Sequence, residues 1–579
     1  MTSATGDSPS NQHILRFLGL SVGQAMLLFA GIVGIASGLA ATGFYWILNE
    51  FVQVFLQARP EGLNTWTVVI TVLSPALGGL ICGLMLHYWS PDARGGVAEV
   101  IEAILHRGGR IRPRVGLVKA LASAICIGSG GSAGREGPVV QIGASVGSTL
   151  ARIFRVTTQN SKLLVACGAA GGIAAVFNAP IGGAFFAAEI ITGRFEMKGL
   201  TWLFTASAMG AAVARSLLHN RATFDTAPHE LLSIWALLLH AVLGVFCACL
   251  GNVFVSLLHK SEVYFASLRL SHFLRPALGG LIVGLIGLAI PQVFGTGGEL
   301  LQEIFAHPVA PGLLLLWMLG KLIATPLTLG SGGSGGDLMP SLFLGASLGG
   351  IFGHWIHLAF PLSTMAPSAY ALVGATALFA GVAHAPMTAI ILGFEMGRNY
   401  GLILPLMVSC SVSALVAKRL RKGSLYTEKL INKGVDVDRL RNFQPDPFDL
   451  VQVSEVMTLD PISVSPKMSL QDLSEKFIST GLHGLLVLED EKIVGIVTVS
   501  DVQRAMEQNS GMTSVLEIAT SDPIVCYAHD TLNSALARLG GLEVGRMPVV
   551  FETHPSRAIG ILSRTDIVRG YSIGLSRRE

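Results

Sequence analysis

Two long stretches of this chain contain no Asp, Glu, Lys or Arg: one runs from Leu163 to Ala188 and the other from Ala371 to Phe394. Apolar runs of about 18 residues or more predict helices that span a membrane. Charged residues make up only 13% of the chain, whereas about 25% is usual in soluble proteins. These features exclude a soluble multi-domain enzyme, a disordered chain and a simple nucleic-acid binder. The other long apolar runs are Ile14–Leu48, Trp66–Leu86, Leu231–Leu257, Pro276–Phe294, Val309–Thr328 and Gly401–Ala417.

The chain divides into two parts of different composition. From about Ile14 to Lys418 it predicts an all-α, multi-pass membrane domain whose helices are broken and tilted, because glycine and proline clusters interrupt the apolar runs. After Arg419, shorter apolar runs alternate with charge, which predicts a small α/β domain. The expected boundaries are a polar N-terminal tail at 1–13, a membrane domain at 14–432 with halves 14–218 and 231–432, a linker at 433–450, and two soluble modules at 451–510 and 511–575.

The membrane domain contains an internal repeat. Lys119–Leu150 aligns without a gap to Lys321–Phe352, with 13 of 32 positions identical, and both copies contain Gly-Ser-Gly-Gly-Ser. A second pair of blocks follows in the same order, because Asn178–Glu189 matches His384–Glu395. Two related halves in a membrane chain are typical of transporters, whose substrate site lies where interrupted segments of both halves meet near the membrane midplane.

The repeated glycine loops predict an anion site. Gly128–Gly134 contains too many glycines for a helix interior, and Pro138 suits the first turn of a new helix. Gly330–Pro340 repeats this arrangement in the second half. Each loop delivers backbone N–H groups and a helix N-terminus, which carries roughly half a positive charge and binds anions without a fully charged ligand. The alternative is that these glycines only permit close helix packing.

Glu136 directly follows the first glycine loop. Helix packing does not explain it, because a carboxylate within a membrane is costly. When ionised it can occupy the anion site itself, and when protonated it would swing out and vacate the site, so we predict a gate that is also a proton acceptor. The aligned residue of the second half is Leu338, so only one half carries this competitor. The structural alternative is a capping carboxylate beside Arg135.

The soluble part also repeats. Asp460-Pro-Ile462 recurs as Asp522-Pro-Ile524, and Gly495–Asp501 recurs as Gly560–Asp566. In each copy a pair of apolar strands leads into a helix that we expect Ser500-Asp501 or Thr565-Asp566 to cap.

These motifs resemble the CLC family of chloride channels and chloride/proton exchangers. Gly134-Arg-Glu-Gly-Pro138 matches the family's gating-glutamate motif, Gly335–Pro340 resembles its GxFxP motif, and Ser424-Leu-Tyr426 resembles the segment that supplies a central tyrosine. The soluble part resembles a pair of CBS domains, regulatory modules that bind adenosyl nucleotides. The resemblance implies a CLC-type inverted repeat, a homodimer with one pore in each subunit, and no required cofactor.

The resemblance also implies a set of functional residues, with Glu136 as the gating and proton-accepting residue. The implied anion-binding residues are Gly95, Gly96, Gly134, Arg135, Gly137, Asp337, Leu338, Met339 and Tyr426. The implied ligands of ATP or another adenosyl nucleotide in the CBS pair are Thr498, Asp501, Thr565 and Asp566. For both aspartates, a role as helix N-caps alone remains an alternative.

Three positions depart from the family pattern. Gly95 stands where the first anion loop usually has serine, so one hydroxyl donor is lost, and such a hydrogen bond to a charged group is worth about 1.5–3 kcal/mol. Leu338 replaces phenylalanine with little expected effect, because the donors there are backbone N–H groups. Ile190 stands at the internal proton-relay position, where many exchangers carry glutamate, and it does not titrate. Glu189 and Glu395 are expected to make structural hydrogen bonds.

We therefore expect chloride transport through a passive, pH-dependent pore gated by Glu136. The alternative is a chloride/proton antiporter of the same family, since water can carry protons to Glu136 without a side-chain relay. The expected partners are chloride and related anions, protons, membrane lipid and a second copy of the chain, with no nucleic acid. The expected location is a bacterial inner membrane, with the N-terminus and the CBS tail in the cytoplasm. The paired lysines Lys119 and Lys321 are expected to add positive potential, to snorkel, or to pair with the carboxylates.

Two other classes of protein share some of these features. Some magnesium channels carry CBS pairs, but a divalent-cation transporter would need several acidic residues in its spans, where the sequence offers essentially Glu136, Glu189 and Glu395. A membrane-anchored nucleotide sensor would not need matching broken loops in both halves. No Ser/His/Asp arrangement or set of metal ligands indicates an enzyme or a metal site.

Overall fold

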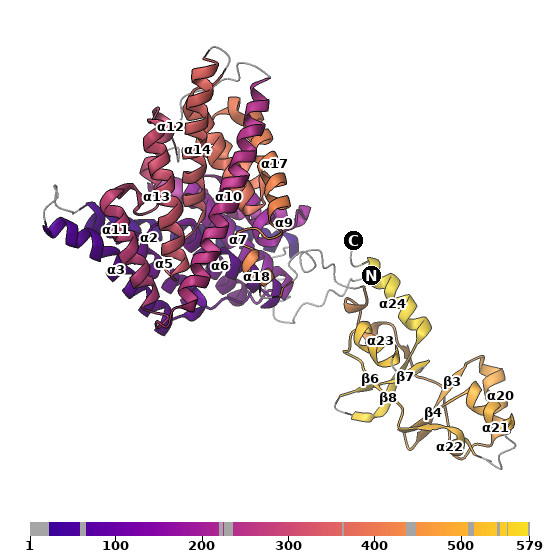
Figure 1. The fold of residues 1–579 in the computed structure, drawn as a ribbon. Coiled ribbons are helices and arrows are strands. Elements are labelled where there is room, and N and C mark those ends of the chain that lie inside the picture. The colour runs from indigo at the N-terminus through magenta and orange to yellow at the C-terminus, as the bar shows by residue number, and fades with distance from the viewer. Residues whose placement is uncertain are drawn as a thin grey trace. The chain divides into compact units, whose positions relative to one another are not determined.

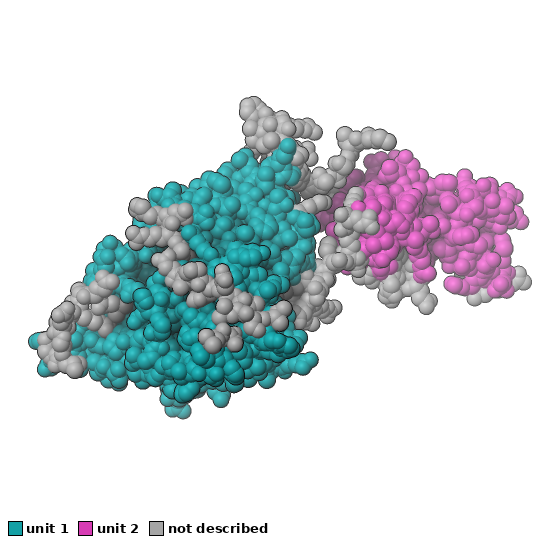
Figure 2. Space-filling view, turned by 90° about the horizontal axis from the view of Figure 1, so that it is seen from above, with its two compact units in different colours: residues 1–441 teal, residues 442–579 magenta. Residues whose placement is uncertain are grey.

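The computed structural model describes residues 22–57, 65–218, 224, 235–361, 364–432, 434–435, 447–507, 514–540, 545–552 and 554–576. The expected N-terminal tail at 1–13 and most of the expected linker at 433–450 lie outside these described residues. The chain forms two compact units, residues 1–441 and residues 442–579, which Figure 2 shows in teal and magenta. Each unit is described by itself.

The first unit is built from helices (Figure 1). Those of the first half are α2 (Val22–Val52), α3 (Thr65–Tyr88), α4 (Val97–His106), α5 (Pro113–Gly128), α6 (Glu136–Ile153), α7 (Thr158–Phe177), α8 (Pro180–Phe186) and α9 (Met197–Leu218). Those of the second half are α10 (Ala236–Ser267), α11 (Arg275–Ala289), α12 (Gly298–Ala306), α13 (Pro311–Gly330), α14 (Leu338–Ala359), α15 (Pro367–Ala383), α16 (Pro386–Gly397), α17 (Ile403–Leu420) and α18 (Glu428–Asn432).

The helices differ in their ability to cross a membrane. Seven helices within the described residues are long and apolar enough to do so, among them α2, α3, α10 and α13. Others are too short, such as α8, which has 7 residues and continues as a π-helical turn over Ala187–Thr192, and α16, which has 12 residues. Pro180 and Pro386 open these two short helices, as the missing N–H of proline permits. The prediction of a multi-pass domain with broken helices is confirmed.

The internal repeat of the sequence is a repeat of structure. In the first half α5, a glycine turn and α6 follow one another, and in the second half α13, a glycine turn and α14 do the same. The turns have matching hydrogen bonds, because the N–H of Gly131 donates to the carbonyl of Cys126 (2.8 Å) and that of Gly333 donates to the carbonyl of Thr328 (3.0 Å). α6 packs on α7 as α14 packs on α15, and in Figure 1 α10, α13 and α14 run alongside one another.

Close packing of these helices depends on glycine. At Gly143 on α6, an added Cβ would lie 2.1 Å from the carbonyl oxygen of Gly168 on α7. At Gly345, which aligns with Gly143, it would lie 2.3 Å from the carbonyl oxygen of Gly374 on α15. Such contacts are shorter than any side chain tolerates, so the glycines permit backbones to touch, as is usual for small residues in membrane helices.

The second unit is a small α/β domain. Its eight-stranded sheet has the order β2-β3-β4-β8-β7-β6, with β1 paired to β8 and β5 paired to β4. Its strands are β1 (Thr458–Leu459), β2 (Ser463–Val464), β3 (Gly484–Glu489), β4 (Lys492–Thr498), β5 (Thr520–Ser521), β6 (Cys526–Tyr527), β7 (Arg546–Phe551) and β8 (His554–Ser563). Its helices are α20 (Leu470–Thr480), α21 (Val499–Glu507), α22 (Val515–Ile518), α23 (Leu532–Gly540) and α24 (Arg564–Ser576). Each sequence repeat has its own apolar core, one around Val487 and one around Val549.

Candidate functional site

The glycine loops of the two halves meet at the centre of the first unit. The N–H of Gly134 donates to the carbonyl of Gly336, and the N–H of Gly336 donates to the carbonyl of Gly134, each at 2.7 Å. A hydroxyl contact between Ser123 and Ser334 (2.7 Å) also crosses between the halves. These pairs bring the N-termini of α6 and α14, which are 202 residues apart in sequence, to one place.

Glu136 lies at the first position of α6, but its carboxylate is bound by the other half. Its Oε1 accepts from the N–H of Leu338 (2.6 Å) and from the N–H of Met339 (3.2 Å), the first two residues of α14. The side chain is buried, with 1% exposure, and Oε2 has no hydrogen-bond partner within the described residues. The carboxylate therefore occupies a helix N-terminus that offers N–H donors and partial positive charge to an anion.

Two glycines make room for this carboxylate. An added Cβ at Gly134 would lie 2.2 Å from Oε2 of Glu136, and one at Gly336 would lie 2.3 Å from Oε1. At Gly336 the same Cβ would also lie 2.6 Å from the backbone nitrogen of Gly137. We call the position of the Glu136 carboxylate on the N–H groups of Leu338 and Met339 the Glu136 seat. Glycine is required at positions 134 and 336 by this seat, and not only by helix packing.

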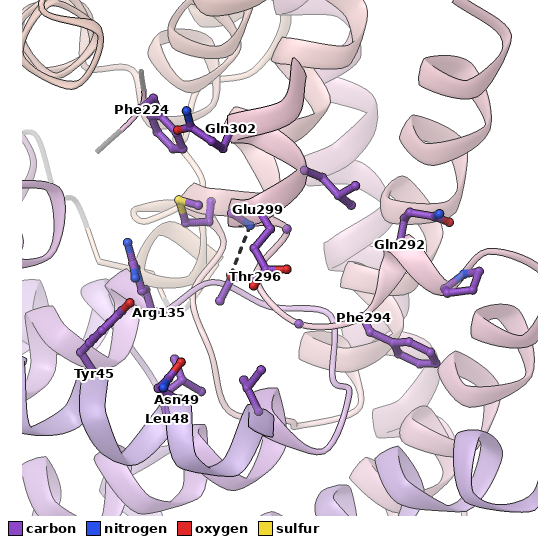
Figure 3. Close-up of a pocket in the computed structure, with 17 residues that line it drawn as sticks. Tyr45, Leu48, Asn49, Arg135, Phe224, Gln292, Phe294, Thr296, Glu299 and Gln302 are labelled. Atoms are coloured by element: carbon purple, nitrogen blue, oxygen red, sulfur yellow. Dashed lines mark hydrogen bonds between the residues drawn. The ribbon is translucent and has the colours of Figure 1, made fainter. Parts of the chain in front are cut away.

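A large cavity lies on one side of Glu136. Its volume is about 900 Å³, and its lining includes Arg135 and Met339, the neighbours of Glu136 and of its Leu338 donor (Figure 3). The guanidinium of Arg135 lies over the ring of Tyr45, 5.3 Å from its centre. We call this space the Arg135 cavity.

A smaller cavity of about 130 Å³ is lined by Gly137 and Gly336. It also contacts four other predicted anion-site residues, Gly95, Gly96, Asp337 and Tyr426. The ring of Tyr426 packs against Phe186, and its hydroxyl is buried with no hydrogen-bond partner within the described residues. We call this space the Tyr426 cavity. Seven of the nine anion-site residues expected from the sequence thus line one of the two cavities. Of the other two, Gly134 joins the loops and Leu338 donates its N–H to Glu136.

Gly95 and Gly96 form the turn before α4, with Gly96 at the N-cap. An added Cβ at Gly95 would lie 1.7 Å from Cγ of Glu99, so the side chain of Glu99 folds over the place that a serine would need. The sequence shows that position 95 lacks a hydroxyl, but we did not expect from it that a carboxylate side chain takes this space. The signal that could have shown it is the four-residue spacing of Gly95 and Glu99, which places Glu99 in the first turn of α4.

The paired lysines hold matching turns. Nζ of Lys119 donates to the carbonyl of Gly95 (2.6 Å), and Nζ of Lys321 donates to the carbonyls of Gly295 (2.8 Å) and Val293 (3.0 Å). Both lysines are buried. The expectation that they snorkel or pair with Glu136, Glu189 or Glu395 was wrong, because the hydrogen bonds of both ammonium groups go to backbone carbonyls.

Glu189 and Glu395 hold the two short helices reciprocally. Oε2 of Glu189 accepts from the N–H and the hydroxyl of Thr388 on α16, each at 2.7 Å. Glu395, on α16, accepts from the N–H of Ile181 (3.0 Å) and of Gly182 (2.6 Å) on α8. Both carboxylates make the structural hydrogen bonds that the sequence predicted. Ile190, next to Glu189, is buried in the apolar core.

Asp337 is the N-cap of α14, but its side chain makes no capping hydrogen bond. It lines the Tyr426 cavity together with Tyr426. The family resemblance named Asp337 among the anion-binding residues, but it gave no separate role to its side chain, a carboxyl group next to the residues that hold Glu136.

In the second unit, the two aspartates among the four predicted nucleotide ligands accept hydrogen bonds from their own turns. Oδ2 of Asp501 accepts from the N–H (2.9 Å) and hydroxyl (2.7 Å) of Thr498, and Oδ2 of Asp566 accepts from the N–H (3.0 Å) and hydroxyl (2.7 Å) of Ser563. Thr565 is exposed on α24. Because α21 begins at Val499 and α24 at Arg564, both helices begin earlier than the caps expected at Ser500 and Thr565.

Comparison with known proteins agrees with this geometry. The family model described as voltage gated chloride channel matches residues 77–418, and the CBS domain model matches residues 453–508 and 515–572. A putative ClcB-like chloride channel protein of Ralstonia nicotianae is 35% identical over 426 residues, which cover 72% of this chain and 99% of the relative. The H(+)/Cl(-) exchange transporter ClcA of Vibrio parahaemolyticus is 31% identical over 436 residues, covering 72% of this chain and 91% of the relative.

A solved structure is also similar. The crystal structure of a slow cyanobacterial Cl-/H+ antiporter matches with a TM-score of 0.66 and 26% identity, over 72% of this chain and 98% of the antiporter. The voltage gated chloride channel model covers most of the membrane domain, and the CBS domain model covers the two soluble repeats. The chain belongs to the CLC family of voltage gated chloride channels and transporters, and it carries a pair of CBS domains.

Proposed function

We propose that this protein carries chloride and related anions between the two cavities, and that Glu136 is the gate between them. The observation that carries the proposal is the seat of the Glu136 carboxylate on the N–H groups of Leu338 and Met339. An anion at that seat would receive the same two hydrogen bonds, so the carboxylate and the permeating anion compete for one site. Protonation removes the negative charge that favours the seat and releases the site to the anion. Family membership favours this function over a divalent-cation transporter or a nucleotide sensor.

The direction of the pathway follows from the ends of the helices. α18, the last helix of the first unit, lines the Tyr426 cavity through Lys429 and Leu430, and the CBS pair follows it in the chain. The C-terminal end of α2 lines the Arg135 cavity through Leu48, Asn49 and Val52. With the CBS pair and the N-terminus in the cytoplasm of a bacterium, the Tyr426 cavity opens inward and the Arg135 cavity opens outward. Each subunit of a homodimer would contain one such pathway.

Passive conduction and proton-coupled exchange both agree with this gate. Ile190 favours passive conduction, because an aliphatic side chain does not carry a proton at the usual relay position. The similarity to an exchange transporter and to a solved antiporter favours exchange. The two functions differ in whether the proton on Glu136 crosses to the inner side during each cycle.

Flux from liposomes tests the gate. Purified protein in chloride-loaded liposomes should release chloride when a potassium ionophore removes the opposing potential, and the rate should rise as the pH falls. Glu136→Gln keeps the size of the side chain and removes its titration, so its flux should no longer depend on pH. Glu303→Gln, an exposed carboxylate on α12, is the matched control and should behave as the unmodified protein. An unchanged pH profile in Glu136→Gln would contradict the gate.

For the CBS pair we propose binding of ATP or another adenosyl nucleotide between Thr498, Asp501, Thr565 and Asp566. Oδ2 of each aspartate already accepts two hydrogen bonds, so Oδ1 of Asp501 is the oxygen that would accept from the ribose hydroxyls. Oδ1 of Asp566 accepts from Arg569 (3.0 Å), so a ribose hydroxyl there would share it with that guanidinium. Asp501→Ala and Asp566→Ala in the full chain should weaken ATP binding measured by calorimetry. Asp472→Ala, which removes a comparable first-turn carboxylate on α20 bound to Ser469, should not.

A further inference from the structure

The walls of the Tyr426 cavity carry more acidic than basic groups. Its ionisable side chains come from the turn before α4, from α4, α10, the N-cap of α14 and α18. They are the cations Arg94 and Lys429, the carboxyl groups Glu99, Glu102, Glu262 and Asp337, and the phenol Tyr426. Cations just outside the lining also act on these carboxyl groups, because Arg107 pairs with Glu102 and Lys119 lies near Glu99. A carboxylate without its own ion pair would repel an anion in this space, so such a carboxyl is favoured to hold a proton while the anion is present.

Nearby cations distinguish three of the four carboxyl groups from the fourth, Asp337. Glu102 accepts a hydrogen bond from Arg107 (2.8 Å), and Glu262 forms an ion pair with Lys429. Glu99 folds over Gly95 near Lys119, which donates to the carbonyl of Gly95. A nearby cation stabilises the ionised form of each of these three groups. Asp337 has no such ion pair within the described residues, and it directly precedes Leu338 and Met339, whose N–H groups hold Glu136.

The position of Asp337 links the cavity to the gate. The two residues that follow it in the chain, Leu338 and Met339, donate the hydrogen bonds that hold Glu136. The same cavity touches Gly137 and Gly336, which flank the Glu136 seat on their respective loops. Its volume of about 130 Å³ has room for a few water molecules at about 30 Å³ each. Water there would connect the Asp337 carboxyl to the edge of the Glu136 seat.

A second buried group points to the same exchange of protons. Tyr426 is buried, with 3% of the residue exposed, and it lines the cavity together with Asp337. Its hydroxyl has no partner at hydrogen-bond geometry within the described residues. A buried hydroxyl without a partner is costly, so a ligand or water is expected to satisfy it. A bound anion accepts from this hydroxyl, and a protonated Asp337 donates to the same anion or to the water next to it.

We propose that the Asp337 side chain is the inner proton acceptor of this protein. It would replace the relay glutamate of many exchangers, at whose position this chain has Ile190. Asp337 takes a proton from water on the inner side as an anion enters the Tyr426 cavity. It returns that proton, through cavity water, to the carboxylate of Glu136 when Glu136 leaves its seat. The inference rests on the proposed gate at Glu136, and it assigns proton-coupled exchange rather than passive conduction to this chain.

Proton uptake on anion binding tests the assignment without a transport assay. Purified full-length protein in weakly buffered detergent is titrated with sodium chloride, and a pH-sensitive dye reports the protons taken up. In Glu136→Gln the gate no longer titrates, and uptake should persist because Asp337 still takes a proton. In the double variant Glu136→Gln/Asp337→Asn, uptake should fall about tenfold or more, since the titratable group next to the anion is gone. Glu136→Gln/Glu303→Gln is the matched control and should take up as many protons as Glu136→Gln.

Several outcomes would overturn the inference. Proton uptake in the Asp337→Asn double variant equal to that in Glu136→Gln would do so, and so would the absence of uptake in Glu136→Gln that binds chloride. If the double variant binds no chloride, Asp337→Glu in the same background must restore both chloride binding and proton uptake, and failure to do so also contradicts the role. If the unmodified protein binds and transports no chloride, the proposed function itself fails. If it transports chloride without protons, the proposed function stands and only the role of Asp337 is lost.

Discussion

The two halves contact each other at two places through carboxylates that bind helix N-termini, and the contact is symmetric at one place and unsymmetric at the other. At α8 and α16 each half supplies a carboxylate, Glu189 or Glu395, that accepts hydrogen bonds from the N-terminus of the other half's helix. At α6 and α14 only Glu136 makes such a contact, because the matching residue is Leu338. The symmetric pair leaves neither helix N-terminus without a carboxylate. At α6 and α14, one helix N-terminus binds one carboxylate, that of Glu136. A gate requires this arrangement, because the side chain can leave and an anion can take its place.

The two kinds of carboxylate also differ in how their oxygens are hydrogen-bonded. Both oxygens of Glu189 and of Glu395 accept hydrogen bonds. Only one oxygen of Glu136 does so among the described residues. Within the described part of the chain, the buried Oε2 of Glu136 is left without a partner, so its carboxylate is less fully satisfied in place than Glu189 or Glu395 and is more easily displaced by an anion.

The largest effect is expected where the Glu136 seat loses its space. Gly336→Ala would place a Cβ 2.3 Å from Oε1 of Glu136 and 2.6 Å from the nitrogen of Gly137. Because a backbone atom is among the clashing atoms, overpacking should cost about 1–3 kcal/mol of stability and remove most chloride flux. Gly312→Ala, at a helical glycine with open space around it, should leave both unchanged. Flux and thermal unfolding of the two variants decide whether the seat needs this glycine.

The second-largest effect on chloride flux is expected when the second half is given a carboxylate to match Glu136. Leu338→Glu adds the carboxylate that the second half lacks, close to Glu136, where two like charges about 4 Å apart repel by about 4 kcal/mol at an effective dielectric of 20. We expect chloride flux to fall about tenfold at neutral pH, which corresponds to roughly 1.4 kcal/mol of that repulsion, and to recover in acid as one carboxyl takes a proton. Leu338→Gln keeps the size and lacks the charge, so it serves as the control. Equal flux at neutral pH in both variants would show that the asymmetry does not matter.

The smallest effect on transport is expected at the symmetric pair. Glu189→Gln and Glu395→Gln should each lower the free energy of unfolding by about 1.5–3 kcal/mol, because hydrogen bonds to a charged group are weakened. Their flux should keep the pH dependence of the unmodified protein. Thermal unfolding and the pH profile of flux measure the two properties separately. A flattened pH profile in either variant would show that the contrast with Glu136 is wrong.

Sequence reasoning found most of the fold and the gate for identifiable reasons. Long uncharged runs and the aligned glycine loops depend on local chemistry, so the broken helices and the place of Glu136 could be predicted. The seat of Glu136 on α14 could not, because it depends on how two segments 202 residues apart come together. The bonds from Lys119 and Lys321 to glycine carbonyls were missed because lysine is usually read as a partner for carboxylates. The place of the Asp337 carboxyl in the wall of the Tyr426 cavity could not be predicted, because it depends on how segments far apart in the sequence come together around this residue.

The central claim is that one site on α14 holds either the Glu136 carboxylate or an anion. The direct measurement is an anomalous-difference map from crystals of Glu136→Gln soaked in bromide. The account predicts a bromide peak within hydrogen-bond distance of the N–H groups of Leu338 and Met339, where Oε1 of Glu136 lies in the unmodified protein. A map with no bromide at these two groups, in crystals that bind it elsewhere, would contradict the account.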